Sequence, residues 1–153
     1  MIECRPRGIF SWNFDLTGDG QKAAIEFNWI GEQGLIFIDG NEHRVTKRGM
    51  FSGEWSMESH RGAIYQAVKS SPFTRTFQIT GPDGITELSA ESMFGRAMKL
   101  SGPGVDCVIK PAHAFTRRAT IEGRTDDFTQ VCFGFWLCIL TWRRSANSGA
   151  ASS

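Results

Sequence analysis

The stretch that decides the fold is residues 128–142, FTQVCFGFWLCILTW. Eleven of its fifteen residues are large apolar, aromatic or cysteine. Three exceptions, Gln130, Gly134 and Thr141, fall on one narrow stripe at helical spacing. A helix with so little polar surface must be buried on nearly every side.

The flanking residues limit this helix. Residues 125–127 (TDD) supply an N-cap and first-turn acids, and Arg143 and Arg144 follow where cations favour the negative end of the helix dipole. We therefore predict a helix over residues 126–144. Its apolar part is about 22 Å long, shorter than a hydrocarbon core of roughly 30 Å, which favours burial in protein. A tail-anchored membrane protein with one C-terminal transmembrane helix stays open as the alternative.

Length and charge set further limits. A chain of 153 residues is long enough for one domain with a real core, which we assign to residues 1–144. The tail, residues 145–153 (SANSGAASS), is small and polar, so we expect it to be disordered. The 17 basic residues are balanced by 16 acidic ones, whereas a nucleic-acid binder usually shows a clear basic excess. We expect no nucleic-acid partner.

The four cysteines indicate the compartment. Cys4, Cys107, Cys132 and Cys138 form no CxxC pair and no framework spacing, and two of them lie inside the apolar helix. They are typical of small core residues in a reducing compartment, so we expect no disulfide. We predict a cytoplasmic protein, with association with a membrane surface left open.

The chain between residues 8 and 123 predicts a mainly β body. Short β-branched and aromatic runs alternate there and are separated by glycine-rich turns. We count ten to twelve strands over about 113 residues, the spacing of a sandwich or barrel. The chain has a terminal apolar helix to bury, so we predict a closed antiparallel barrel that encloses it, which requires about eleven strands or more. The aromatic residues expected to point inward are Phe10, Trp12, Phe27, Trp29, Phe37, Trp55, Phe77 and Phe115.

Three segments carry a resemblance to a known family. They are residues 67–70 (AVKS) with 73–79 (FTRTFQI), residues 91–96 (ESMFGR), and the terminal helix itself. In this layout of strands first and apolar helix last, the chain resembles the tubby C-terminal-like superfamily, which includes the LURP-one-related proteins and the phospholipid scramblases. The resemblance covers nearly the whole chain and implies a tubby-like barrel with a central helix.

The same resemblance implies a function. Tubby-type domains hold phosphoinositide headgroups with lysines and arginines that project from adjacent strands, and the resemblance implies a similar patch built from Lys47, Arg48, Lys69 and Arg75. The expected partner is then an anionic phospholipid or membrane surface, with a protein partner as the second possibility. The competing interpretation is that these cations are solvated strand residues that keep sheet edges soluble.

One stretch has the spacing of a calcium loop. Asp15, Thr17, Asp19 and Glu26 place oxygen ligands at suitable intervals within residues 15–26. The flanks alternate like strands, although calcium loops of this kind lie between helices, so we favour a β-hairpin with turn residues.

Motifs for catalysis are absent from the sequence. It has no GxxxxGK[ST] loop, no GxGxxG before a helix and no GxSxG elbow. His43, His60 and His113 have no partner at zinc-ligand spacing. We predict a non-enzymatic module with no catalytic residues, no metal and no cofactor. An enzyme with a site at the barrel rim remains the other alternative.

Overall fold

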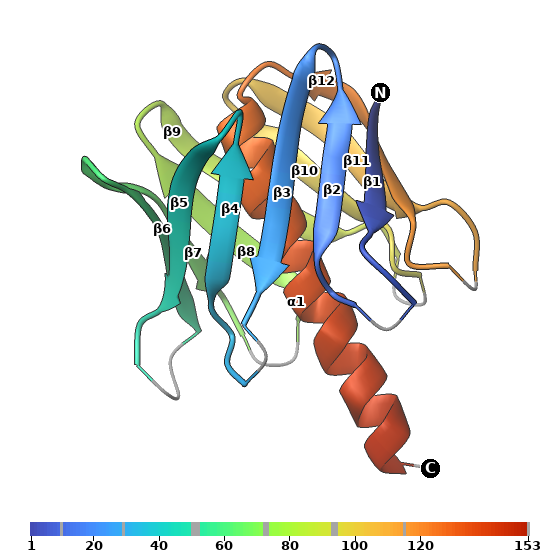
Figure 1. Cartoon of the computed structure of the whole chain (residues 1–153). Coiled ribbons are helices and arrows are strands. Elements are labelled where there is room, and N and C mark those ends of the chain that lie inside the picture. Colours follow the sequence, from blue (N-terminus) through green and yellow to red (C-terminus); the bar gives the residue numbers. More distant parts are fainter. Residues whose placement is uncertain are drawn as a thin grey trace.

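The structure is a computed structural model. It describes residues 1–9, 11–28, 30–49, 53–71, 74–92, 95–114 and 116–152. Neighbouring strands pair antiparallel, and β1 pairs with β12, so the sheet closes into a twelve-stranded barrel around one helix, which confirms the predicted fold (Figure 1). The elements are β1 (Ile2–Pro6), β2 (Phe14–Gly18), β3 (Gln21–Phe27), β4 (Gly34–Ile38), β5 (Asn41–Lys47), β6 (Glu54–Ser59), β7 (Gly62–Lys69), β8 (Thr76–Gly81), β9 (Gly84–Ala90), β10 (Met98–Gly102), β11 (Val105–Pro111), β12 (Ala119–Thr125) and α1 (Phe128–Ser152).

The two ends of the barrel join the strands differently. At one end, which we call the turn end, five strand pairs are joined by two-residue turns. Asp19-Gly20 and Asp39-Gly40 are two of these turns, and their four φ angles lie between 49° and 85°. Positive φ at both turn residues gives the hairpin a twist that matches the twist of its strands. At the opposite end, the loop end, six longer connections join the strands (Figure 1). These are residues 7–13, 28–33, 48–53, 70–75, 91–97 and 112–118.

The helix enters the barrel from the turn end. The amide of Asp127 donates to the carbonyl of Gly104 at 3.0 Å, and its carboxylate Oδ1 accepts from the amide of Gln130 at 3.1 Å as an N-cap. The other carboxylate oxygen accepts from the hydroxyl of Tyr65 on β7. These contacts fix the start of α1 against the sheet, and Figure 1 shows the helix leaving through the loop end.

Inside the barrel the helix forms the core. Every residue from 130 to 142 is buried. Phe135 meets Phe14 of β2 edge to face at 5.1 Å between ring centroids, and Trp136 stacks on Phe27 of β3 at 4.4 Å. The predicted burial in protein is therefore confirmed. No helix in the described part of the chain has the length and apolar character needed to cross a membrane.

The polar stripe of the helix is also accommodated inside the barrel. Gln130 Nε2 donates to the carbonyl of Pro103 at 3.2 Å, and Thr141 Oγ1 donates to a carbonyl one turn earlier in the helix at 3.0 Å. A Cβ at Gly134 would lie 3.1 Å from Leu100 on β10. The polar side chains of the stripe therefore have hydrogen-bond partners inside the barrel, and Gly134 allows the helix to pack closely against β10. The stripe is not a solvent-exposed face.

The helix differs from the sequence prediction at both ends. It begins at Phe128, two residues later than predicted, because Asp127 serves as the N-cap. It continues to Ser152, so residues 145–152 are helical, where we predict a disordered tail. Extending a helix that is already formed requires no new nucleation, which explains why a short polar segment can follow the buried turns.

One strand is missing from the prediction. β1 has only five residues and includes Glu3 and Arg5, yet Ile2 and Cys4 are buried. β1 closes the barrel by pairing with β12, more than a hundred residues away.

The predicted inward faces are partly correct. Trp55 and Phe77 are fully buried, and Trp12 and Phe27 are half-buried against the core. The prediction for Phe37 is wrong. Its neighbours Ile36 and Ile38 point inward, so Phe37 lies on the outer face. The remaining three, Phe10, Trp29 and Phe115, lie outside the described residues.

Candidate functional site

Charge is distributed unevenly along the barrel axis. Counting each connection with its two flanking strand residues, and α1 beyond residue 142, the loop end has ten lysines and arginines against three glutamates. Counted in the same way, the turn end has five aspartates against one arginine and the amino group of Met1. The loop-end cations are Arg7, Lys47, Arg48, Lys69, Arg75, Arg96, Arg117, Arg118, Arg143 and Arg144. The near-neutral net charge therefore conceals a basic end and an acidic end.

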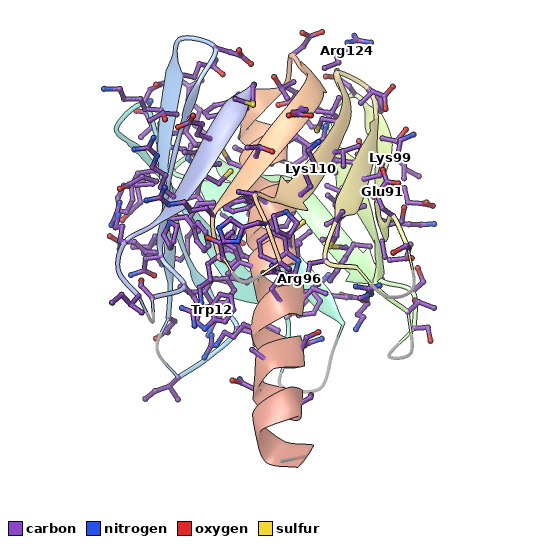
Figure 2. All side chains as sticks on the ribbon, turned by 90° about the vertical axis from the view of Figure 1, so that its right-hand side faces the viewer. Trp12, Glu91, Arg96, Lys99, Lys110 and Arg124 are labelled. Carbon is purple, nitrogen blue, oxygen red and sulfur yellow. The ribbon has the colours of Figure 1, made fainter. Side chains whose placement is uncertain are left out.

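This polarity agrees with the direction of the helix. The N-terminus of α1 lies at the acidic turn end, and its C-terminal half passes the basic loop end (Figure 1). A helix is partly positive at its N-terminus and partly negative at its C-terminus. The aspartates therefore lie near the positive end of the helix and the lysines and arginines near its negative end, and both arrangements are favourable. Figure 2 shows Trp12 and Arg96 beside the helix near the loop end, and Arg124 at the opposite end.

The most ordered charge group surrounds one carboxylate. Glu32 accepts from Lys47 Nζ at 2.7 Å and from two nitrogens of Arg144 at 2.5 and 2.6 Å. Both cations also lie over the ring of Trp55, at 5.5 and 5.4 Å from its centroid. The Trp55 indole donates to the backbone carbonyl of Glu32 at 3.2 Å. We call Glu32, Lys47, Trp55, Lys69 and Arg144 the Glu32 cluster.

Lys69 is the surplus cation of the Glu32 cluster. It ends β7, half-buried on the inward-facing side of the strand. Burial and the neighbouring charge of Arg144 lower the pKa of Lys69, and Glu32 offsets only part of this effect. Among the described residues no carboxylate forms an ion pair with Lys69, so the Glu32 cluster carries three cations and one anion.

Glu32 makes the stability of the protein depend on pH. Burial alone raises the pKa of this carboxyl, but the hydrogen bonds and charges of Arg144 and Lys47 outweigh it and lower the pKa from 4.5 to about 2. Because the folded pKa is below the unfolded one, the ion pairs stabilise the fold above about pH 4.5 and lose this effect as pH falls toward about 2.

We therefore expect Glu32→Gln to lower the free energy of unfolding by about 2 kcal/mol at pH 7 and by much less near pH 2. Urea unfolding of parent and variant across this pH range measures the difference. Glu91→Gln, an exposed change in another loop-end connection, is the matched control and is expected to have little effect. A Glu32→Gln penalty that does not shrink as pH falls would contradict the assigned ion pairs.

The structure separates the four residues predicted to hold a headgroup. Lys47 and Lys69 belong to the Glu32 cluster. Arg48 is exposed beside it, 3.8 Å from Glu54. Arg75 has another partner, because its guanidinium donates to the backbone carbonyls of Ser92 and Gly95 at 2.5 and 2.6 Å. All four lie at the loop end, but only three of them lie close to one another.

Arg75 belongs to a series of arginines that connect neighbouring loops. Arg96 donates to three carbonyls of the next connection, residues 112–118, at 2.9 to 3.1 Å. Arg117 donates in turn to the carbonyl of Ser11 in the connection after β1 at 2.8 Å and lies 4.1 Å over the ring of Trp12. These guanidinium groups satisfy loop carbonyls that the sheet leaves unpaired. They hold the loop end together, and sequence analysis missed this role for Arg75.

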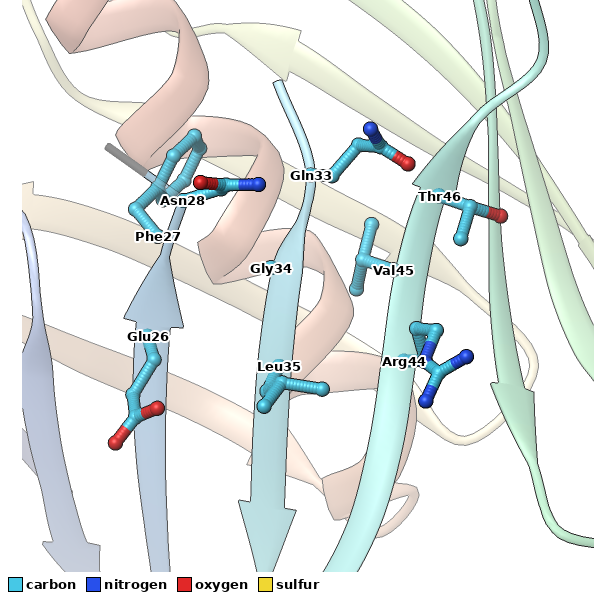
Figure 3. A pocket seen from close by; sticks show the side chains of 9 residues that line it. All are labelled: Glu26, Phe27, Asn28, Gln33, Gly34, Leu35, Arg44, Val45 and Thr46. Carbon is cyan, nitrogen blue, oxygen red and sulfur yellow. The ribbon is translucent and has the colours of Figure 1, made fainter. Parts of the chain in front are cut away.

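Two of the pockets among the described residues have the volume to hold a small ligand. A pocket of about 580 Å³ opens beside the emerging helix and is lined by Ser11, Trp12, Asn13, Phe27, Asn28, Arg143 and Asn147. A second pocket, of about 310 Å³, lies on the outer face of β3–β5, where Gly34 has no side chain (Figure 3). Its two charged groups, Glu26 and Arg44, stand on either side of Leu35 in this view. Neither lining brings together an acid and a base as an active site requires.

The calcium-like stretch is a hairpin. Asp15 and Thr17 lie on the outer face of β2, and Asp19 occupies the two-residue turn to β3. Asp15 and Glu26 both pair with Arg7. Among the described residues no group of three or more His, Cys, Asp or Glu side chains is placed to hold a metal.

Comparison with known proteins does not assign a family. Known protein families, curated proteins and solved structures give no match for this chain. The tubby-type resemblance therefore stays a hypothesis that rests on the layout of the elements. Three of the residues behind it, Phe73, Met93 and Phe94, lie outside the described residues.

A repeat in the sequence could have revealed the loop end. A phenylalanine or tryptophan occurs in every connection of this end, at positions 10, 29, 51, 73, 94 and 115, which are 19 to 22 residues apart. Arg75, Arg96 and Arg117 recur at intervals of 21 residues. Self-similarity at such a period indicates repeated hairpin units. It would have assigned these arginines to equivalent positions, although not to their carbonyl partners.

Proposed function

We propose that this protein is a non-enzymatic barrel module that binds anionic phospholipid headgroups with its loop end. The observation that carries the proposal is the separation of charge, with ten cations against three carboxylates at one end and mainly aspartates at the other. A basic surface near an anionic membrane gains about 1 kcal/mol for each lysine or arginine. The acidic turn end would be repelled, so the same charges would also orient the barrel.

Within the loop end, we assign the headgroup contacts to Arg48, Lys69 and Arg118. Lys69 lacks a carboxylate partner among the described residues, and Arg48 and Arg118 are exposed. Lys47 and Arg75 then have a structural role, because their charges already meet Glu32 and loop carbonyls. Membership of the tubby-like superfamily is part of the proposal, and a closed barrel around a C-terminal helix is compatible with it. A protein partner is the second candidate for the same basic surface.

Replacing Arg48, Lys69 and Arg118 together by glutamine is expected to weaken binding to anionic vesicles by about a hundredfold, since three contacts of about 1 kcal/mol are lost. Cosedimentation with vesicles of phosphatidylcholine and phosphatidylserine, or with added phosphoinositide, measures the change. Binding by the parent should also weaken as salt rises from about 0.1 to 0.5 M.

The matched control makes the same charge change at or near the turn end, with Lys22, Arg61 and Arg124 replaced by glutamine. This variant is expected to bind at least as well as the parent. The loop end keeps all of its cations, and the turn end becomes less attractive to the bilayer. Equal loss in both variants would show that only net charge matters. No binding by the parent would overturn the proposal in favour of a protein partner.

A further inference from the structure

The loop end exposes apolar side chains beside its cations. Ile9, in the connection after β1, is 85% exposed, and Ile30, in the connection after β3, is 90% exposed. They are the two most exposed large apolar side chains among the described residues. Both neighbour an aromatic residue in sequence, Phe10 and Trp29. A single exposed isoleucine needs no explanation, but two at the same basic end indicate a surface with a partner.

The sequences of the two ends differ in the same direction. All six loop-end connections contain a phenylalanine or tryptophan, at positions that lie outside the described residues. The five two-residue turns of the other end consist of Asp19-Gly20, Asp39-Gly40, His60-Arg61, Pro82-Asp83 and Pro103-Gly104. None of them contains an isoleucine, leucine, valine, methionine, phenylalanine, tyrosine or tryptophan. The turn end does expose Met1 and Ile85, at 60% and 61%, but the two large apolar side chains that are almost fully exposed lie in connections of the basic end.

The loop-end connections are arranged around the helix. Because the barrel is closed, its six loop-end connections form a ring around the emerging helix (Figure 1). Three arginines tie successive connections of this ring to one another, which restrains their relative positions. Because α1 emerges through this ring and continues to Ser152, a flat surface can contact the connections on one side of the helix, and Ile9 and Ile30 lie in connections that both adjoin the β2–β3 hairpin. Exposed aliphatic side chains near basic residues, in segments that also contain aromatic residues, are the composition that binds the interfacial region of anionic membranes.

We propose that the loop end penetrates the interfacial region of an anionic bilayer through the β1–β2 and β3–β4 connections, with Ile9 and Ile30 below the level of the phosphates and the barrel tilted so that the protruding end of α1 stays outside the hydrocarbon. This inference rests on the proposed function and adds depth and orientation to it. Electrostatic attraction brings the basic end to the surface, and the apolar tips then bury area that is exposed in the free protein.

Site-specific fluorescence tests this inference on the full chain. The four native cysteines are buried, and burial raises the pKa of each thiol, to about 11 for Cys107. They should therefore react slowly with a thiol-specific dye. Single variants Ile9→Cys, Ile30→Cys and, as the turn-end control, Arg61→Cys can each be labelled with an environment-sensitive nitrobenzoxadiazole dye. The probe surface is a vesicle of phosphatidylcholine with about 30% phosphatidylserine.

On vesicle binding, the dye at positions 9 and 30 is expected to shift its emission to the blue and to brighten severalfold, while the dye at position 61 stays unchanged. Cosedimentation of the same labelled samples measures binding separately. Binding without a shift at positions 9 and 30 would overturn penetration and leave the proposed function standing. A shift at position 61 alone would overturn the orientation. Absence of binding would overturn the proposed function and this inference with it.

Discussion

A chain that ends at Thr125 is expected not to fold, although it retains all twelve strands. The barrel interior is occupied by α1, and the six side chains of Phe133, Phe135, Trp136, Leu137, Ile139 and Leu140 are each at most 1% exposed. Burying a large apolar side chain stabilises a fold by roughly 1.5 to 3 kcal/mol, so these six account for about 9 to 18 kcal/mol before ordering costs. That sum is comparable to the whole stability of a domain.

The truncated chain should be insoluble or molten, with weak near-ultraviolet circular dichroism and strong binding of a hydrophobic dye. The matched control ends at Arg144, which removes the part of α1 that follows its buried turns and keeps the Glu32 cluster. This chain is expected to melt cooperatively, close to the midpoint of the parent. Cooperative melting of the chain ending at Thr125 near that same midpoint would contradict the helix as core.

Phe135→Ala is expected to lower the free energy of unfolding by about 3 to 5 kcal/mol. The Phe135 ring is fully buried and makes edge-to-face contacts with Phe14 at 5.1 Å and with Trp142 at 6.0 Å. Removing it opens a cavity at the centre of the barrel, where the closed sheet has little freedom to collapse. Urea unfolding at neutral pH, followed by circular dichroism, measures the change.

Phe37→Ala is the matched control for this substitution. It removes the same ring from the outer face of β4, so we expect a loss below about 1 kcal/mol. If Phe135→Ala leaves too little folded protein to measure, Phe135→Leu should still show a loss of about 1 kcal/mol or more. Equal effects at positions 37 and 135 would contradict the assignment of the inner and outer faces.

Several features of this fold could be predicted from local sequence. The apolar run at residues 128–142 cannot be solvated, so its burial follows from composition alone. The turns at residues 19–20 and 39–40 combine aspartate and glycine, which tolerate the positive φ angles that a tight hairpin needs. A chain with many hairpins and one buried helix leaves few arrangements other than a barrel around that helix.

Other features depended on contacts between distant segments. Residues 35–38 (LIFI) are apolar without interruption, so alternation does not reveal which of them point inward. The register of β4 with β3 and β5 decides this and places Phe37 outside. β1 resembles a charged terminus until β12 pairs with it, because strand pairing satisfies its backbone and buries Ile2 and Cys4.

The candidate site is mainly a product of tertiary structure. The sequence predicted Lys47, Arg48, Lys69 and Arg75 as cations on strands, and the alternating direction of successive strands brings all four to one end. Their different partners follow from long-range contacts, since Glu32 and Arg144 are 112 residues apart. Composition and spacing determined that this chain buries a helix inside strands. Only the closed barrel decided which of these charges meet, because Glu32 reaches Arg144 only where the sheet closes around α1.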